Sequence, residues 1–91
     1  MVTGVKMMSK IRVVFFASLR EKIGQSEYIT ELAMPLSIGE FKQQLAIELD
    51  NGQPLLEQGI QSSIDFEFAR DTDVIPKNVK EVAFFPPVTG G

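Results

Sequence analysis

Residues 37–52, SIGEFKQQLAIELDNG, contain the helical pattern that decides the fold. Ser37 and Glu40 have the spacing of a capping box, in which each side chain satisfies a free backbone N–H at the start of a helix. Apolar residues then recur at helical spacing and predict one buried face: Ile38, Phe41, Leu45 and Leu49. The opposite face is expected to be solvated: Glu40, Lys42, Gln43, Gln44 and Glu48. Asn51–Gly52 is expected to end the helix by supplying a left-handed position.

Two strands are predicted before this helix. Ile11–Ala17 is rich in β-branched and aromatic residues, which favour strands. A short helical turn over Ser18–Ile23 is expected to stop at Gly24. Glu27–Leu32 then reads as a returning strand, which Pro35 ends.

Two more strands are predicted after the helix. One is a half-buried strand in which apolar and acidic residues alternate: Ile64, Asp65, Phe66, Glu67 and Phe68. The other is Glu81–Phe85, and Pro86–Pro87 ends its pairing because proline lacks the N–H donor. The connecting segments are expected to be loops: Pro54–Gly59 and Arg70–Lys80.

The order strand, strand, helix, strand, strand predicts an α+β domain in which one main helix covers one face of a mixed sheet. A β-grasp, with the first and last strands parallel at the centre, satisfies this order. The helix is then expected to pack against six sheet residues: Val13, Phe15, Phe66, Phe68, Val82 and Phe84. Residues 10–91 are predicted to form this single domain, after a flexible extension over 1–9 and with a flexible tail over 86–91.

Composition narrows the function. The 91 residues suffice for one domain, and the net charge of −3 argues against a nucleic-acid partner, which would require a basic surface. The chain has no Cys and no His, so it lacks a thiolate nucleophile, the usual general base and the commonest metal ligand. Carboxylates remain available for acid–base work. The longest apolar run, Val13–Ala17, is far too short for a membrane span, and a cytoplasmic location is expected.

A metal site is not expected. Three acidic residues lie close together in the sequence: Glu67, Asp71 and Asp73. Their segment lacks the glycine and the distal glutamate of a calcium loop. We interpret them as part of a solvated turn.

Strand alternation predicts an aromatic surface. Arg12 and Glu81 mark the solvated face of the first and last strands, and Phe16 and Phe85 share that face. Exposed aromatic residues commonly anchor protein interfaces, so these two are candidates for partner docking. The alternative is that the N-terminal extension covers them.

The last residues carry the chemistry that the rest of the chain lacks. A carboxylate is a poor acyl donor, but adenylation gives it a good leaving group, and a sulfur donor can then replace AMP to leave a thiocarboxylate. Gly90–Gly91 forms the thinnest possible chain for entering a partner's enclosed active site, and Pro86–Pro87 stiffens its exit. The alternative is a frayed terminus without function.

The segment 81–91, EVAFFPPVTGG, resembles the C-terminus of the molybdopterin synthase small subunit family. Phe15-Phe16-Ala17 followed by Arg20-Glu21 resembles that family's first strand and turn. The resemblance implies partner contacts from the exposed aromatics, the tail and one basic residue: Phe16, Arg20, Phe85, Pro86, Pro87, Val88 and Thr89. For Arg20 and Glu21, a local ion pair is an equal alternative.

The resemblance also implies a reaction sequence. An E1-like adenylating enzyme would use ATP and Mg²⁺ to activate Gly91, and a persulfide sulfur donor would make the thiocarboxylate. The tail would then enter a large catalytic subunit and deliver sulfur to cyclic pyranopterin monophosphate, forming the dithiolene of molybdopterin. The chain itself would bind no cofactor and act as a co-substrate, because the catalytic side chains belong to its partners.

Two alternatives remain open at this point. One is a sulfur carrier for another route, such as thiamine or amino-acid synthesis. The other is a ubiquitin-like protein modifier, which is joined to a lysine through Gly91.

Overall fold

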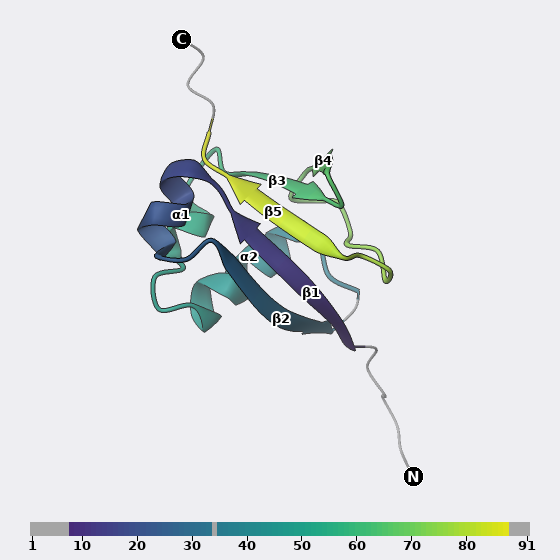
Figure 1. Cartoon of the computed structure of the whole chain (residues 1–91). Helices are drawn as coiled ribbons and strands as arrows, with labels where there is room; N and C mark the ends of the chain where they lie inside the picture. Colours follow the sequence, from purple (N-terminus) through teal and green to yellow (C-terminus); the bar gives the residue numbers. More distant parts are fainter. Residues whose placement is uncertain (1–7, 34, 88–91) are drawn as a thin grey trace.

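Five strands form one mixed sheet in the computed structural model, which describes residues 8–33 and 35–87. Their order across the sheet is β2-β1-β5-β3-β4. Figure 1 shows β1 and β5 side by side at its centre, with their arrows pointing the same way. The strands are β1 (Met8–Phe15), β2 (Glu27–Ala33), β3 (Gln61–Ile64), β4 (Glu67–Ala69) and β5 (Glu81–Phe85). The parallel pairing of the first and last strands, predicted from the sequence, is confirmed.

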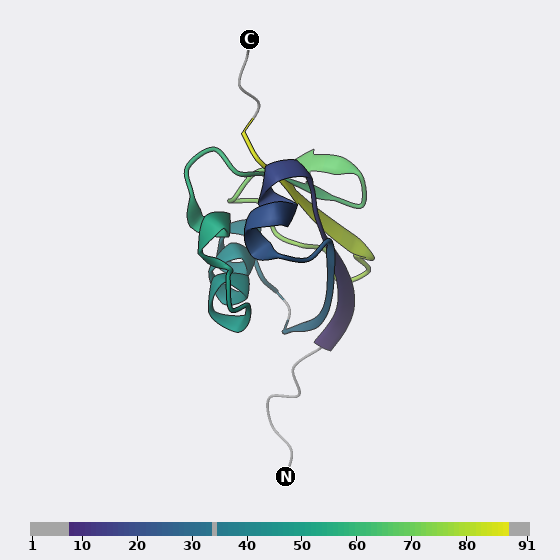
Figure 2. The ribbon, with the colours of Figure 1, turned by 60° about the vertical axis from the view of Figure 1, so that its left-hand side comes forward.

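The helices gather on one side of this sheet and leave its other face open (Figure 2). They are α1 (Ala17–Ile23), α2 (Ile38–Glu48) and the 3₁₀-helix η1 (Gln53–Leu56). The last of these lies where a loop over Pro54–Gly59 was expected, and it buries Leu55. No helix in residues 8–33 and 35–87 is long and apolar enough to cross a membrane.

The core lies between α2 and the sheet. Helix α2 and its C-terminal cap contribute Ile38, Phe41, Leu45 and Leu49 to this apolar cluster. Sheet residues in the same cluster include Val13, Phe15, Val82 and Phe84. The ring of Phe41 lies 6.0 Å from that of Phe84 between centroids, and Phe84 stacks on Phe15 at 6.3 Å. The predicted inward faces of α2, β1 and β5 are therefore confirmed.

Helix α2 starts as its sequence predicted. The Ser37 hydroxyl accepts the backbone N–H of Glu40 at 3.2 Å, and the Glu40 carboxylate accepts the N–H of Ser37 at 2.9 Å. The backbone N–H of Ser37 lowers the pKa of Glu40, because its hydrogen bond stabilises the ionised carboxylate.

Helix α2 does not end as predicted. Its last residue is Glu48, and Gly52 is in the right-handed region with φ of −84°. Gly52 instead allows a close approach, because a Cβ there would lie 2.7 Å from the Cα atom of Ala46. By contrast, α1 does end at a left-handed glycine, Gly24 with φ of 89°, as expected.

Strand β1 begins earlier and ends earlier than predicted. It pairs with β2 from Met8 onward, so Met8 and Ser9 belong to the sheet rather than to the expected extension. Residues 1–7 lie outside the described residues. The strand stops at Phe15 because Ala17 adopts a positive φ of 53° and α1 begins there.

The predicted strand over residues 64–68 is a hairpin, and the prediction was wrong here. β3 ends at Ile64 and β4 begins at Glu67, and these two residues pair directly. The residues between them, Asp65 and Phe66, have positive φ of 47° and 73°, as in tight two-residue turns. Directly paired residues share a face and neighbours alternate, so Phe68 points away from the helices. Phe66 and Phe68 are 83% and 79% exposed instead of buried.

Lys42 was expected on the solvated face of α2 but is buried. Its ammonium group donates to the carbonyl of Ile60 at 2.9 Å and lies 2.8 Å from the carboxylate of Asp71. A long aliphatic stem lets lysine cover apolar surface while its charged end finds partners, which the helical pattern alone does not reveal.

Candidate functional site: a tail exit beside an aromatic groove

The tail begins where β5 ends. Phe85 is the last residue of the strand, Pro86 is half-buried and Pro87 is exposed. The predicted site residues Val88, Thr89, Gly90 and Gly91 lie outside the described residues. The structure therefore describes the base of the tail and the surface around it.

The base of the tail is seated between α1 and the loop after η1. A hollow of about 240 Å³ lies there, lined by Ser18, Leu19, Lys22, Glu57, Ile60, Pro86 and Pro87. Lys22 and Glu57 pair across it at 3.4 Å. Gly59 has φ of 90°, and a Cβ there would lie 3.0 Å from the Cβ of Pro87. Glycine at position 59 therefore leaves room for Pro87, at which the chain leaves the sheet.

Phe16 and Phe85 meet on the open face of the sheet, as predicted. Phe16 is 45% exposed, Phe85 is half-buried, and their ring centroids are 5.5 Å apart. The alternative, that an N-terminal extension covers them, concerns residues 1–7, which lie outside the described residues.

Two further aromatics, which the alternating pattern predicted to be buried, join this pair. The ring of Phe68 meets that of Phe85 edge to face, with centroids 6.0 Å apart. Phe66 stands at the adjoining turn. Together they form what we term the aromatic groove, a hollow of about 180 Å³ lined by Phe16, Ser63, Phe66, Phe68, Glu81, Ala83 and Phe85. The direct pairing of Ile64 with Glu67 places Phe68 there, and the sequence pattern carried no signal for it.

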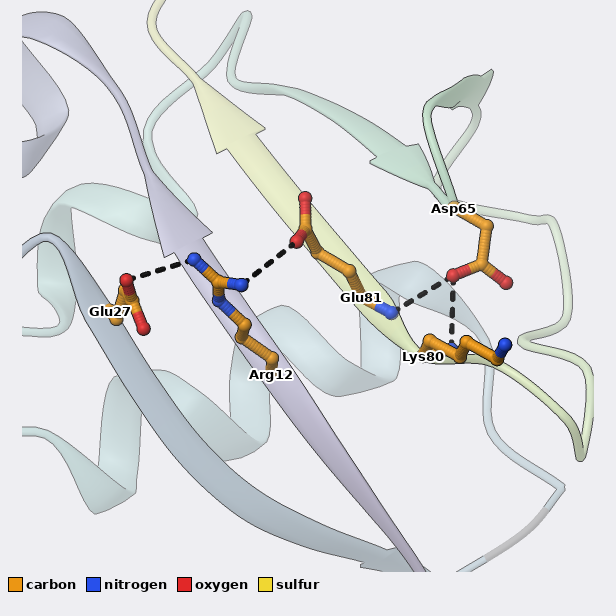
Figure 3. Close-up of polar contacts among 5 residues, drawn as sticks. All are labelled: Arg12, Glu27, Asp65, Lys80 and Glu81. Carbon is orange, nitrogen blue, oxygen red and sulfur yellow. Dashed lines mark hydrogen bonds and ion pairs between the residues drawn. The ribbon is translucent and has the colours of Figure 1, made fainter.

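Charged side chains from β1, β2 and β5 meet beside Glu81, which lines the groove (Figure 3). The Arg12 guanidinium lies 2.9 Å from the Glu27 carboxylate and 3.9 Å from that of Glu81. Arg12 and Glu27 are half-exposed, and such pairs contribute little to stability in water. They leave both signs of charge available to a partner at the edge of the apolar surface.

The β3–β4 turn is fastened to the start of β5. In Figure 3 the Asp65 carboxylate faces the backbone of Lys80 and Glu81. It accepts their N–H groups at 3.0 and 2.9 Å, while the Asp65 N–H donates to the carbonyl of Glu81 at 2.8 Å. These three bonds fix the turn that carries Phe66.

The remaining predicted residues lie elsewhere. Arg20 and Glu21 are exposed on α1, and none of the four ion pairs among the described residues includes either of them. Asp71 pairs with Lys42, and Asp73 accepts the N–H of Arg70 at 2.8 Å. In the described part of the chain, no three His, Cys, Asp or Glu residues form a group that could hold a metal ion.

Comparisons with known proteins identify relatives of this chain. The ThiS family model matches residues 13–91. The molybdopterin synthase sulfur carrier subunit of Escherichia coli (strain K12) is 35% identical over 82 residues, which cover 89% of this chain and 99% of that protein.

Solved structures support the fold. The crystal structure of SAMP1 from Haloferax volcanii matches with a TM-score of 0.69 at 21% identity, covering 91% of this chain and 100% of that one. The solution structure of small archaeal modifier protein 1 from Methanosarcina acetivorans matches with a TM-score of 0.70 at 20% identity, covering 92% and 98%. These likenesses confirm the ubiquitin-like β-grasp.

Proposed function

The chain belongs to the ThiS family, and from this membership we propose that it is the sulfur carrier of a molybdopterin synthase. The observation that carries the proposal is the 35% identity to the Escherichia coli sulfur carrier subunit across nearly the whole of both chains. The charge of −3 and the lack of Cys and His agree with a chain that presents a tail to partners instead of performing catalysis itself.

The reacting group in this proposal is the carboxylate of Gly91. Attack of this carboxylate on ATP, assisted by Mg²⁺ in an adenylating partner, forms an acyl adenylate and releases pyrophosphate. A sulfur nucleophile then attacks the carbonyl carbon, so that a C–S bond forms as the C–O bond to AMP breaks. When the donor is a persulfide, a thiol must also reduce the resulting S–S bond to release the thiocarboxylate.

The described residues support this role through the tail exit and the groove. Pro86 and Pro87 follow directly on β5, and Gly59 allows Pro87 to pack closely against it. Residues 86–91 span at most roughly 20 Å when extended. A partner that encloses Gly91 must therefore sit close to the sheet, where the aromatic groove offers an apolar surface for docking.

The partners follow from the same proposal. The large subunit of molybdopterin synthase would receive the thiocarboxylate tail and transfer its sulfur to cyclic pyranopterin monophosphate. An E1-like enzyme would supply adenylation, and a persulfide protein would supply sulfur. ATP and Mg²⁺ belong to the adenylating partner.

Two other functions use the same tail. A carrier for thiamine or another sulfur route is suggested by the family, and a protein modifier is suggested by the names of the archaeal structures. A modifier would leave Gly91 in isopeptide bonds to lysines. A carrier for another route would purify with a different acceptor enzyme.

Reconstitution tests the proposal. The chain is incubated with the adenylating enzyme, ATP, Mg²⁺ and a sulfur donor, and then with the large subunit and cyclic pyranopterin monophosphate. We expect molybdopterin in amounts that follow the thiocarboxylate supplied. Formation of the thiocarboxylate without any transfer to this substrate would assign the chain to another sulfur route.

A further inference from the structure

The turn between β3 and β4 holds a bulky aromatic residue in a conformation that such residues seldom adopt. Phe66 has φ of 73°, in the left-handed region. Two-residue hairpin turns that need positive φ strongly prefer glycine or asparagine, because a large side chain at such an angle is strained. Strain of this kind persists only where the surrounding structure imposes it.

The surrounding structure does impose it here. Asp65, the other residue in the turn, accepts the N–H groups of Lys80 and Glu81 and donates its own N–H to Glu81. Figure 3 shows its carboxylate turned toward the start of β5. Three hydrogen bonds therefore hold the turn against a strand at the centre of the sheet.

The free chain gains little from the strained residue. The Phe66 side chain is 83% exposed, so it contributes almost no burial to the core. It instead lines the aromatic groove together with Phe16, Phe68 and Phe85. An exposed aromatic ring that strains the backbone lowers the stability of the isolated chain. It contributes favourable free energy only when a partner buries it.

The partner that holds the tail is the occupant that the structure favours. Strand β5 forms the floor of the groove at Ala83 and leads directly into Pro86–Pro87. A protein that encloses Gly91 within roughly 20 Å of Pro86 is brought against this face. Apolar, aromatic surfaces are typical of lasting complexes between subunits, which favours the large subunit over a transient partner.

We propose that Phe66 is a docking residue for the large subunit and that Asp65 is its positioning residue. The proposal rests on the sulfur-carrier function. The backbone strain at Phe66 lowers the stability of the free chain, and burial of the ring in the complex contributes to the binding free energy. The variant Phe66→Asn separates the two effects, because asparagine tolerates positive φ but removes the aromatic ring.

The experiment measures thermal unfolding of each variant and its affinity for the large subunit by titration calorimetry. For Phe66→Asn and Phe66→Gly we expect a melting temperature at or above that of the parent and affinity weakened about fivefold or more. Asp65→Ala is expected to lower both, and Asp65→Asn to restore both, because its amide oxygen still accepts the two N–H groups. Ile47→Ala, at an 85% exposed position on α2, is the matched control and should leave affinity unchanged.

A parent chain that does not bind the large subunit would contradict the function on which this proposal rests, whereas the comparisons among variants test only the groove. If Phe85→Ala weakens binding but both Phe66 variants bind like the parent, the role of Phe66 is overturned and the docking face stands. If no groove variant changes affinity, the docking face itself is wrong. Lower melting temperatures for both Phe66 variants would show that the turn is not strained by its aromatic residue.

Discussion

Phe84 and Phe85 are neighbours in β5 but lie on opposite faces of the sheet. Phe84 is fully buried and packs against the rings of Phe15 and Phe41. Phe85 meets Phe16 and Phe68 on the open face. At the residue scale, alternation along one strand thus gives two neighbouring phenylalanines different roles. One stabilises the core and the other lies on the surface.

Replacing a core aromatic tests the first of these roles. Phe41→Ala should lower the free energy of unfolding by roughly 3–5 kcal/mol, because it leaves a cavity under Phe84. Urea denaturation measures the loss, with Ile47→Ala as an exposed control on the same helix. A loss no larger than that of the control would contradict the assigned face of α2.

Replacing the outward aromatic tests the second role. Phe85→Ala should weaken binding to the large subunit by about 1 kcal/mol or more while the fold remains intact. A calorimetric titration gives the affinity, and circular dichroism reports the fold. Unchanged affinity in a folded variant would remove Phe85 from the interface.

At the element scale, α2 is attached at both of its ends. The capping box fixes its start. Near its end, the Glu48 carboxylate accepts the hydroxyls of Tyr28 and Thr30 on β2 at 2.9 and 3.1 Å. The bond to Glu48 stabilises the neutral phenol and raises the pKa of Tyr28. These contacts set how the helix lies across the sheet.

The capping box gives α2 a dependence on pH. The pKa of Glu40 is lowered from 4.5 in the folded chain, so its stabilising contribution is present above 4.5 and is lost as the pH falls through the lower folded value. Glu40→Gln can still accept the Ser37 N–H but does not titrate. The parent's advantage over this variant, measured by denaturation at several pH values, should be constant near neutrality and shrink in acid. An advantage independent of pH would contradict the assignment.

The sequence predicted the elements whose signals are local. Ser37 and Glu40 sit within one helical turn, and Pro86–Pro87 ends β5 by removing donors, so both predictions needed no long-range contact. The hairpin was missed because the turn Asp65–Phe66 lacks glycine and continues the apparent alternation. The turn is held instead by hydrogen bonds that Asp65 accepts from Lys80 and Glu81, which lie fifteen and sixteen residues away. The alternating pattern therefore did not predict that Phe66 and Phe68 belong to the aromatic groove.

At the scale of the whole molecule, the fold places the base of the tail next to the aromatic groove. The parallel pairing of β1 and β5 brings Phe16 beside Phe85. The β3–β4 hairpin adds Phe66 from its turn and Phe68 from β4. In the function proposed above, one partner would contact the aromatic groove and enclose the tail at the same time.

The exit itself can be tested with two matched glycines. Gly59 and Gly24 have φ of 90° and 89°, but only Gly59 faces Pro87, and nothing lies within 4 Å of a Cβ at Gly24. Alanine at either position should lower the free energy of unfolding by about 1–2 kcal/mol. Only Gly59→Ala should also slow thiocarboxylate formation several-fold, because it displaces the base of the tail. Equal rates for the two variants would show that the exit direction is unimportant.

In the proposed function, sulfur is carried at Gly91, and intact mass spectrometry tests this most directly. The chain is incubated with the adenylating enzyme, ATP, Mg²⁺ and a sulfur donor, beside a variant lacking Gly91 and one extended beyond it. Each deleted residue moves the reacting carbonyl back by about 3.3 Å, and an extension replaces the carboxylate with an amide. We predict that only the parent gains the mass of one oxygen exchanged for sulfur, while all three melt at the same temperature. The same mass gain in the variant lacking Gly91 would contradict the account.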